Sequence, residues 1–250
     1  MFEITLPKRF AACALFVLAT RVFAAEPDVP ALLRQADAWR LADSAAQVET
    51  RVQTYKGDTL EKEKRYTVLL RGNTHSLVLF RAAGEAGQKV LMLGEDFWML
   101  MPTSQRPIRI TPMQKLLGEA STGDIATLTW SGDYTGTVHR QVEADGQPGL
   151  ELELAATRKS LSYQRILLTV AARDGKPVRA ELFAASGRKV KDARFGYGTL
   201  EGKTTVTSMV LTDEIQTGQR TVVSYLSRKP RKVPDEYFNP QFLVRNEVNP

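Results

Sequence analysis

Residues 89–101 read KVLMLGEDFWMLM, and their order of apolar and turn residues indicates the fold. Two apolar runs, Lys89–Leu93 and residues 97–101, flank the turn residues Gly94-Glu95-Asp96. Short apolar runs separated by turn residues are typical of neighbouring strands rather than helices. This stretch therefore predicts two strands that lie next to each other in a sheet.

The same pattern of strand-like segments separated by turn residues continues on both sides of residues 89–101. Upstream, residues 65–71 and 76–81 flank Gly72-Asn73, which is typical of a hairpin. Apolar and polar residues alternate along several segments, as they do in strands with one wet face. The segments with strand character outside this stretch are residues 48–54, 65–71, 76–81, 150–154, 164–171, 178–182, 188–195, 204–212 and 220–227. We predict about ten strands with short connections, and therefore a meandering antiparallel sheet in an α+β, mainly β protein.

Two segments carry helical features instead. The apolar residues of segment 29–41 recur at helical spacing, and they are Leu32, Leu33, Ala36 and Trp39. Thr111 can cap a second helix over residues 112–117, with Pro112 in its first position and Gly118 at its end. Its apolar side consists of Met113, Leu116 and Leu117. One or two further helical turns are expected from Ser121.

The N-terminus has the features of a signal peptide. Lys8 and Arg9 precede an apolar run over residues 10–20, and Val22-Phe23-Ala24 fits a cleavage site. We predict a signal peptide over residues 1–24, cleavage after Ala24, one mature domain over residues 25–250, and a periplasmic location. Cys13, the one cysteine, is then removed, so the mature protein folds without disulfides.

Charge and composition exclude several function classes. The 250 residues include 43% hydrophobic and 25% charged residues, which is ordinary for a globular protein. Loss of three cations and one anion with the signal peptide lowers the net charge from +6 to +4. This mild basicity does not indicate a nucleic-acid partner.

Residues for catalysis or metal binding are not grouped in any familiar pattern. His75 and His139 lie far apart in the chain and lack the spacing of zinc ligands. Asp124 and Asp133 bracket an apolar segment as a pair of carboxylates would, but capping or turn roles explain them better. The sequence also lacks a Gly-x-Ser-x-Gly elbow and a phosphate-binding loop. We expect no enzyme activity, catalytic residue, metal or cofactor.

Two groups of residues leave alternatives open. The methionine-rich segment 97–101 suits either core packing or the wall of a lipid-lined cavity, because methionine adapts to varied apolar partners. The basic residues Arg228, Lys229, Arg231 and Lys232 suit either a solvated strand end or contact with anionic headgroups or an acidic partner.

Several blocks of the sequence resemble the family of outer-membrane lipoprotein-sorting proteins, within the wider LolA/LolB-like periplasmic carrier superfamily. These blocks are QKVLMLG (88–94), FWMLMP (97–102), RPIRITP (106–112), QKLLG (114–118), ASTGD (120–124) and DYT (133–135). The resemblance extends more loosely over nearly all of the mature chain. The missing lipid anchor makes the soluble carrier the closer analogue than the membrane receptor.

The resemblance implies a single, strongly curved antiparallel sheet, an open and incomplete β-barrel, closed by short helices over an apolar cavity. It implies a soluble periplasmic carrier, monomeric, that takes lipoprotein acyl chains or other lipid from an inner-membrane exporter of the ABC or RND type. An outer-membrane acceptor would receive the cargo. A sensor of lipid or mislocalised lipoprotein is the alternative function for the same fold.

The cavity and lid residues expected on this basis come from the segments just described. They are Leu91, Leu93, Phe97, Trp98, Met99, Met101, Met113, Leu116 and Leu117. Arg71, in Arg71-Gly72-Asn73, stands where the family's carrier has an arginine that holds the lid, although glycine here replaces the family's proline.

Overall fold

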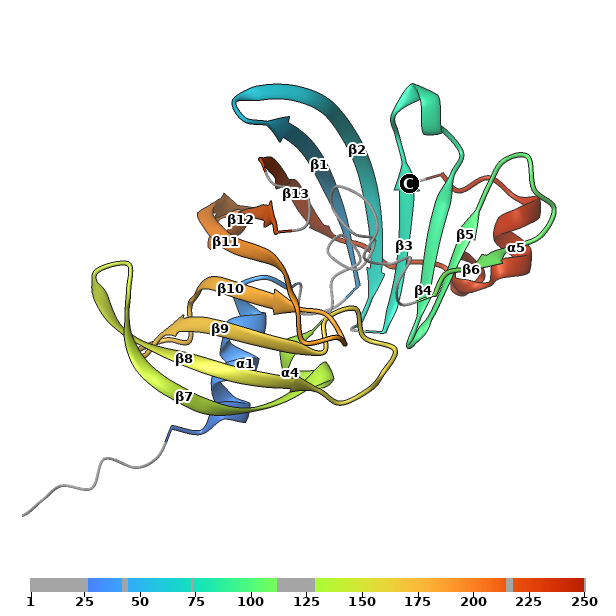
Figure 1. Cartoon of the computed structure of the whole chain (residues 1–250). Coiled ribbons are helices and arrows are strands. Elements are labelled where there is room, and N and C mark those ends of the chain that lie inside the picture. The colour runs from blue at the N-terminus through green and yellow to red at the C-terminus, as the bar shows by residue number, and fades with distance from the viewer. Residues whose placement is uncertain (1–26, 42–44, 73, 112–128, 215–217, 250) are drawn as a thin grey trace, which may run out of the picture.

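The computed structural model describes residues 27–41, 45–72, 74–111, 129–214 and 218–249. Its main feature is one strongly curved antiparallel sheet that wraps part of the way around an apolar core (Figure 1). The predicted fold class, a mainly β protein with an open curved sheet, is confirmed.

Within the described residues, thirteen strands form this sheet, hydrogen-bonded in the order β6-β5-β4-β3-β2-β1-β13-β12-β11-β10-β9-β8-β7. In chain order the strands are β1 (Ala46–Lys56), β2 (Thr59–Arg71), β3 (His75–Phe80), β4 (Lys89–Leu93), β5 (Asp96–Leu100), β6 (Ile108–Arg109), β7 (Tyr134–Ala144), β8 (Gln147–Ala156), β9 (Arg165–Ala171), β10 (Pro177–Phe183), β11 (Lys189–Leu200), β12 (Lys203–Asp213) and β13 (Gln219–Pro230). Short helical elements accompany them: α1 (Val29–Ala38), η1 (Ala83–Glu85), α4 (Trp130–Asp133), η2 (Asp235–Phe238) and α5 (Pro240–Arg245).

The sheet consists of two meanders joined by the pairing of β1 with β13. Strands β1 to β6 form one wing and β7 to β13 form the other, and Figure 1 shows the wings diverging from this central pair. In the part of the chain that the structure describes, β6 and β7 lie at opposite ends of the hydrogen-bonding order. The sheet is therefore not closed into a barrel.

The predicted strands and turns around residues 89–101 are confirmed. Leu93 pairs with Asp96, so the two strands are joined by the two residues Gly94 and Glu95. Gly94 has φ +56°, a left-handed conformation that glycine adopts without a steric penalty. The hairpin at Gly72 is confirmed in the same way, because Arg71 pairs with His75.

The prediction of about ten strands was too low, because β6 and β7 were not recognised. Strand β6 is only two residues long, which is too short to show a period. Strand β7 lies at the edge of the sheet, and most of its side chains are exposed or half-buried. An edge strand packs few side chains against the core, so its sequence does not alternate clearly between apolar and polar residues.

Helix α1 begins as predicted but ends three residues earlier. Asp28 caps it by accepting a hydrogen bond from the backbone N–H of Ala31 at 3.1 Å. The helix ends at Ala38, because the carbonyl of Trp39 turns away to accept a hydrogen bond from the N–H of Val206 at 2.9 Å. The predicted helix over 112–117 and the helical turns expected from Ser121 fall on residues outside the described ranges, except that α4 begins at Trp130.

The two faces of the sheet carry separate apolar clusters. We call the face on which α1 and α4 pack the inner face, and its buried side chains the inner cluster. Leu152, Leu154 and Leu168 are fully buried there. The outer face of β2 to β5 carries a second group, the outer cluster, which includes Leu69, Leu77 and Leu91. Neighbouring residues of one strand belong to different clusters because strand side chains alternate between faces.

The C-terminal segment covers the outer cluster. Phe238 of η2 and Leu243 of α5 are buried against the leucines of β2 to β5, and Figure 1 shows α5 beside β5. The Nζ of Lys89 donates hydrogen bonds to the carbonyls of Leu243 and Asn246 at the end of α5. Such a cation stabilises a helix C-terminus.

His75 makes the contact between β3 and this C-terminal segment sensitive to pH. Its ring meets the Phe238 ring edge to face, with centroids 5.2 Å apart. Burial and the nearby Arg71 guanidinium lower the pKa of His75 from 6.5, against the opposing effect of Asp235. The unfolded chain then binds the proton more readily than the folded protein does. The contribution of neutral His75 to the stability of the fold is therefore complete above pH 6.5 and is lost as the pH falls.

We therefore expect the melting temperature to fall between pH 7.5 and pH 5.5 through this group. The fall should be smaller in His75→Gln. It should persist in His139→Gln, because His139 lies on β7, far from the C-terminal segment along the sheet. Thermal melts followed by circular dichroism measure all three. An identical fall in His75→Gln and the wild type would contradict a role for His75.

Candidate functional site

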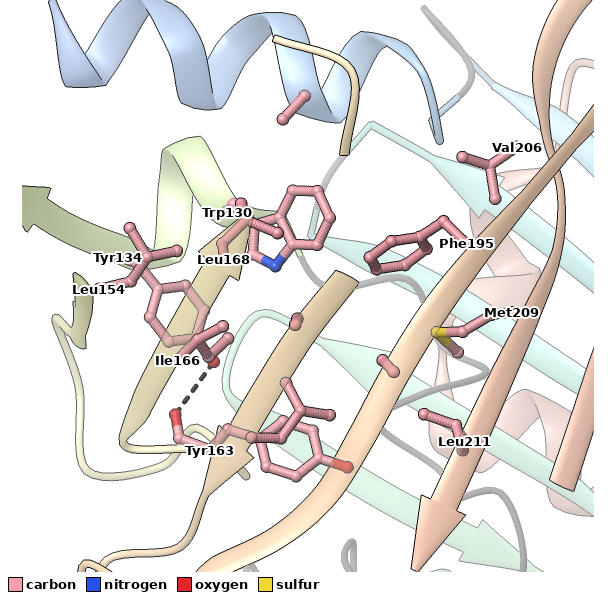
Figure 2. Close-up of a cluster of buried hydrophobic side chains, with 14 of the residues drawn as sticks. Trp130, Tyr134, Leu154, Tyr163, Ile166, Leu168, Phe195, Val206, Met209 and Leu211 are labelled. Carbon is pink, nitrogen blue, oxygen red and sulfur yellow. Dashed lines mark hydrogen bonds between the residues drawn. The ribbon is translucent and has the colours of Figure 1, made fainter. Parts of the chain in front are cut away.

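An aromatic cavity lies on the inner face, beneath the end of α1. Its volume is about 50 Å³. Figure 2 shows Trp130 of α4 directed toward Phe195 of β11, with Met209 of β12 and Tyr134 of β7 nearby. The residues that line the cavity are Arg40, Trp130, Tyr134, Tyr163, Ile166, Ala180, Leu182, Ala193, Phe195 and Met209.

The strand register explains why a hollow forms at this place. Ala180 of β10 pairs with Ala193 of β11, so two small side chains lie side by side on the inner face. Phe195 pairs with Met209, which places two large side chains next to them. Small residues beside large ones leave a space that close packing elsewhere in the core does not.

Hydrogen bonds fix the aromatic side chains around this space. The hydroxyl of Tyr134 donates to the carbonyl of Tyr163 at 3.0 Å, which satisfies the polar end of a buried tyrosine (Figure 2). The rings of Trp130 and Phe195 meet edge to face with their centroids 5.6 Å apart. One hydrogen bond and one edge-to-face contact thus hold aromatic rings of the cavity wall in place.

Arg40 and Asp37 hold α4 over the cavity. The guanidinium of Arg40 lies 3.8 Å from the centre of the Trp130 ring, a cation–π contact. The buried carboxylate of Asp37 accepts hydrogen bonds from the backbone N–H groups of Trp130 and Ser131, at 3.0 and 2.8 Å. It also pairs with Arg40 at 3.2 Å. Asp37 of α1 thus holds α4 in place, and it also holds Arg40, which covers Trp130.

A second carboxylate anchors the other end of α4 and connects it to the opposite wing. Asp133 pairs with Arg158, which also lies 3.4 Å from Glu95 in the β4–β5 turn. Asp133 also accepts hydrogen bonds from the N–H and hydroxyl of Thr129, which ties the two ends of this helical turn together. Burial raises the pKa of the Asp133 carboxyl, and Arg158 opposes this shift.

The predicted cavity residues are divided between the two faces of the sheet. Phe97 and Met99 point to the inner face and pack with the inner cluster. Leu91, Leu93 and Trp98 point to the outer face, where the C-terminal segment covers them. The sequence prediction grouped them because it followed a whole apolar segment, whereas strand geometry sends alternate side chains to opposite faces. Met101 is half-buried just beyond β5. The remaining predicted residues Met113, Leu116 and Leu117 lie outside the described ranges.

Arg71 lies away from the aromatic cavity. Its guanidinium pairs with Asp235 and stacks on the ring of Phe238, 4.4 Å from the ring centre, so it holds the C-terminal segment. Arg40 is the arginine that lines the cavity. Sequence reasoning placed residue 40 only at the margin of the first helix, although the stretch Trp39-Arg40 at a helix end combined an aromatic and a cationic side chain.

The basic residues after position 227 have two kinds of environment. Arg228 donates hydrogen bonds to the carbonyls of Arg40 and Leu41, at 2.5 and 3.4 Å, and so ties β13 to the segment after α1. Arg231 binds the side chain of Gln47 and the carbonyl of Asn249. Lys229 and Lys232 are exposed. The two arginines hold the chain together here, and contact of the basic residues with anionic headgroups or an acidic partner stays a prediction, with Lys229 and Lys232 the exposed members.

The described residues contain no group of three or more His, Cys, Asp or Glu side chains placed to hold a metal ion. No helix within these same ranges is long and apolar enough to cross a membrane. Apolar and aromatic side chains thus dominate the lining of the cavity on the inner face of this open curved sheet.

Comparisons with known proteins identify the family. A LolA superfamily protein from Nitrosomonas europaea is 34% identical, with a TM-score of 0.77 over 84% of this chain and 96% of that one. The model of a protein family described as "Uncharacterized protein" matches residues 72–245. No curated protein matches. The chain belongs to the LolA superfamily.

Two further solved structures share the fold at lower identity. One, described as an outer membrane lipoprotein-sorting protein domain, comes from Vibrio parahaemolyticus and is 18% identical, with a TM-score of 0.70 over 86% of this chain and 98% of that one. A DUF1329 family protein from Desulfovibrio piger is 22% identical, with a TM-score of 0.71 over 86% and 97%.

Proposed function

We propose that this protein is a soluble periplasmic carrier for the acyl chains of lipoproteins or a closely related lipid. The observation that carries the proposal is the aromatic cavity on the inner face, closed by Trp130 and Arg40. Membership in the LolA superfamily supports it. The carrier takes its cargo from an inner-membrane exporter of the ABC or RND type and passes it to an outer-membrane acceptor, as a monomer and without chemical change.

The physical need for such a carrier is large. Each CH₂ of an acyl chain kept out of water is worth about 0.8 kcal/mol, so a long chain does not cross an aqueous compartment unprotected. An apolar inner face under a helical cover provides the protection. Neither Phe195 nor Met209, which line the cavity wall, carries a charge that entry of an acyl chain would have to desolvate.

Uptake of an acyl chain requires the cavity to widen. Its volume of about 50 Å³ has room for only one or two water molecules, whereas sites for ligands occupy about 300–1,000 Å³. The movable part is α4, because it is four residues long and is held by side chains of Asp37 and Arg158. Displacement of Trp130 joins the cavity to the rest of the inner face, where Phe97 and Met99 extend the binding surface.

The test compares two matched substitutions in a binding assay with a fluorescent fatty acid. Met209→Gln places an amide of similar size in the cavity wall, and a buried amide without a partner costs about 1–3 kcal/mol. We expect binding to weaken about tenfold or more. Leu60→Gln changes an exposed side chain at the tip of the β1–β2 hairpin and should bind like the wild type.

Mass spectrometry of the protein isolated from the periplasm identifies the cargo. Acyl-containing lipid should co-purify with the wild type, and less of it with Met209→Gln. A wild type that carries no lipid and does not bind the fatty acid would contradict the proposed function. Thermal melts of both variants show whether a loss of binding reflects a loss of folding.

A further inference from the structure

The sheet divides between β12 and β13. These strands pair only where Ser208–Thr212 of β12 meets residues 220–224 of β13. Residues 203–207 of β12 and 225–230 of β13 continue past this ladder, each still paired with its other neighbour, β11 or β1. We call the space between these two stretches the strand gap.

The chain's own backbone already binds in the strand gap. The carbonyl of Trp39 accepts hydrogen bonds from the N–H of Val206 at 2.9 Å and from the hydroxyl of Thr205 at 2.6 Å. Across the gap, Arg228 of β13 donates to the carbonyls of Arg40 and Leu41. These hydrogen bonds are made with the chain's own residues 39–41, and they show that the gap accommodates a peptide backbone through contacts with its carbonyl groups.

A cavity of about 360 Å³ lies next to these hydrogen bonds. Ala38, Leu41 and Leu200 give it an apolar wall, and Thr204, Thr205 and Arg228 give it a polar one. This volume falls within the range of ligand sites, and the mixed lining differs from the aromatic cavity. A peptide segment matches it, because a peptide combines small apolar groups with backbone donors and acceptors.

The strand gap and the aromatic cavity meet at one residue. The guanidinium of Arg40 covers Trp130 at the aromatic cavity, while the carbonyl of the same residue accepts a hydrogen bond from Arg228 in the gap. When the acyl chains of a lipoprotein enter the aromatic cavity, the part of the lipoprotein attached to those chains therefore lies close to the strand gap.

We propose that the strand gap binds the extended peptide that follows the acylated residue of a cargo lipoprotein. The inference rests on the proposed carrier function and adds a second recognition element to it. The peptide forms backbone hydrogen bonds with the edge of β12 or β13, the mode by which a strand is added to an exposed sheet edge. Because backbone groups are common to all sequences, this mode suits a carrier that accepts many cargo proteins.

The experiment uses two probes and two matched variants of the full mature protein. One probe is a diacylated lipopeptide with a six-residue peptide, and the other is a fluorescent fatty acid without peptide. Thr204→Trp fills the cavity from an exposed position, while Thr137→Trp changes an exposed threonine on β7, remote from the gap. We expect Thr204→Trp to weaken lipopeptide binding roughly tenfold and leave fatty-acid binding unchanged. Thr137→Trp should match the wild type with both probes.

A third lipopeptide, N-methylated along the peptide backbone, tests the kind of contact. It should bind the wild type about as weakly as the fatty acid does, because its methyl groups keep the peptide backbone, carbonyl groups included, from pairing with a strand edge. Equal affinity of the wild type for the lipopeptide and the fatty acid would overturn the inference while leaving the proposed function intact, as would normal lipopeptide binding by Thr204→Trp. A wild type that binds neither probe would overturn both.

Discussion

Leu168→Lys is expected to prevent folding, whereas Leu167→Lys is expected to leave stability nearly unchanged. Leu168 lies on β9 within the inner cluster and is fully buried. Truncating such a leucine costs about 2–5 kcal/mol, and an unpaired buried charge costs several more. Since a domain is stable by only about 5–15 kcal/mol, the substitution removes most or all of this margin.

Leu167 provides the control because it is adjacent in sequence and lies on the opposite face. It is half-buried, and in the strand register it lies between Glu153 of β8 and Glu181 of β10. A lysine there has two carboxylates as cross-strand neighbours, and such opposite-charge pairs are favourable. Soluble yield and melting temperature measure the difference. Similar losses in both variants would show that the inner and outer faces of β9 have been assigned wrongly.

Asp37→Ala is expected to release α4 from α1 and to destabilise the protein by about 3–5 kcal/mol. Asp37 is buried and accepts hydrogen bonds from the backbone of Trp130 and Ser131 and from the guanidinium of Arg40. Its removal leaves two backbone donors and a nearly buried cation without this acceptor. Because Trp130 covers the aromatic cavity, uptake of a fluorescent fatty acid should become faster at the same time.

Asp28→Ala is the matched control on the same helix. Asp28 caps α1 through one exposed hydrogen bond to Ala31, and loss of such a cap costs about 0.5–2 kcal/mol. It does not contact α4, so the rate of uptake should stay at the wild-type value. Stopped-flow fluorescence and thermal melts give the two readouts. If Asp37→Ala took up the probe no faster than Asp28→Ala, then α4 would not control access.

The two faces of the sheet are covered by different segments, and they differ in how much apolar surface is available to a ligand. The outer face of β2 to β5 is apolar and covered by the chain's own C-terminal segment. Farther along the outer face, charged side chains pair across strands, as Arg140 does with the nearly buried Glu151 at 2.8 Å. The inner face is where apolar surface, an aromatic cavity and a short, side-chain-anchored helix coincide. Binding of an apolar cargo is therefore expected on the inner face.

The sequence alone predicted the elements whose signals are local. Alternation along residues 150–154 and the turn residues after Leu93 are properties of a few adjacent residues, and both predictions are confirmed. The helical spacing of Leu32, Leu33, Ala36 and Trp39 allowed the start of α1 to be located. Edge strand β7 was not predicted, because a strand that packs on only one neighbour shows little apolar periodicity.

The candidate site was predicted less well, for a physical reason. Sequence reasoning selected the apolar stretch of β4 and β5, and strand geometry sends Trp98 outward and Phe97 inward. The cavity instead gathers Trp130, Phe195 and Met209, which lie on three elements far apart in the chain. Only the register of β10, β11 and β12 brings them together, and register depends on pairing across the sheet.

An antiparallel, mainly β protein that resembles the LolA superfamily could be predicted from the sequence, because periodicity, turn residues and family blocks are encoded over short distances. The roles of Arg40, which lines the cavity, and Arg71, which holds the C-terminal segment, emerged from the three-dimensional structure. Both arginines follow apolar stretches and are alike in sequence. Their roles differ because the end of α1 folds onto the inner face, while β2 ends beneath η2 on the outer face.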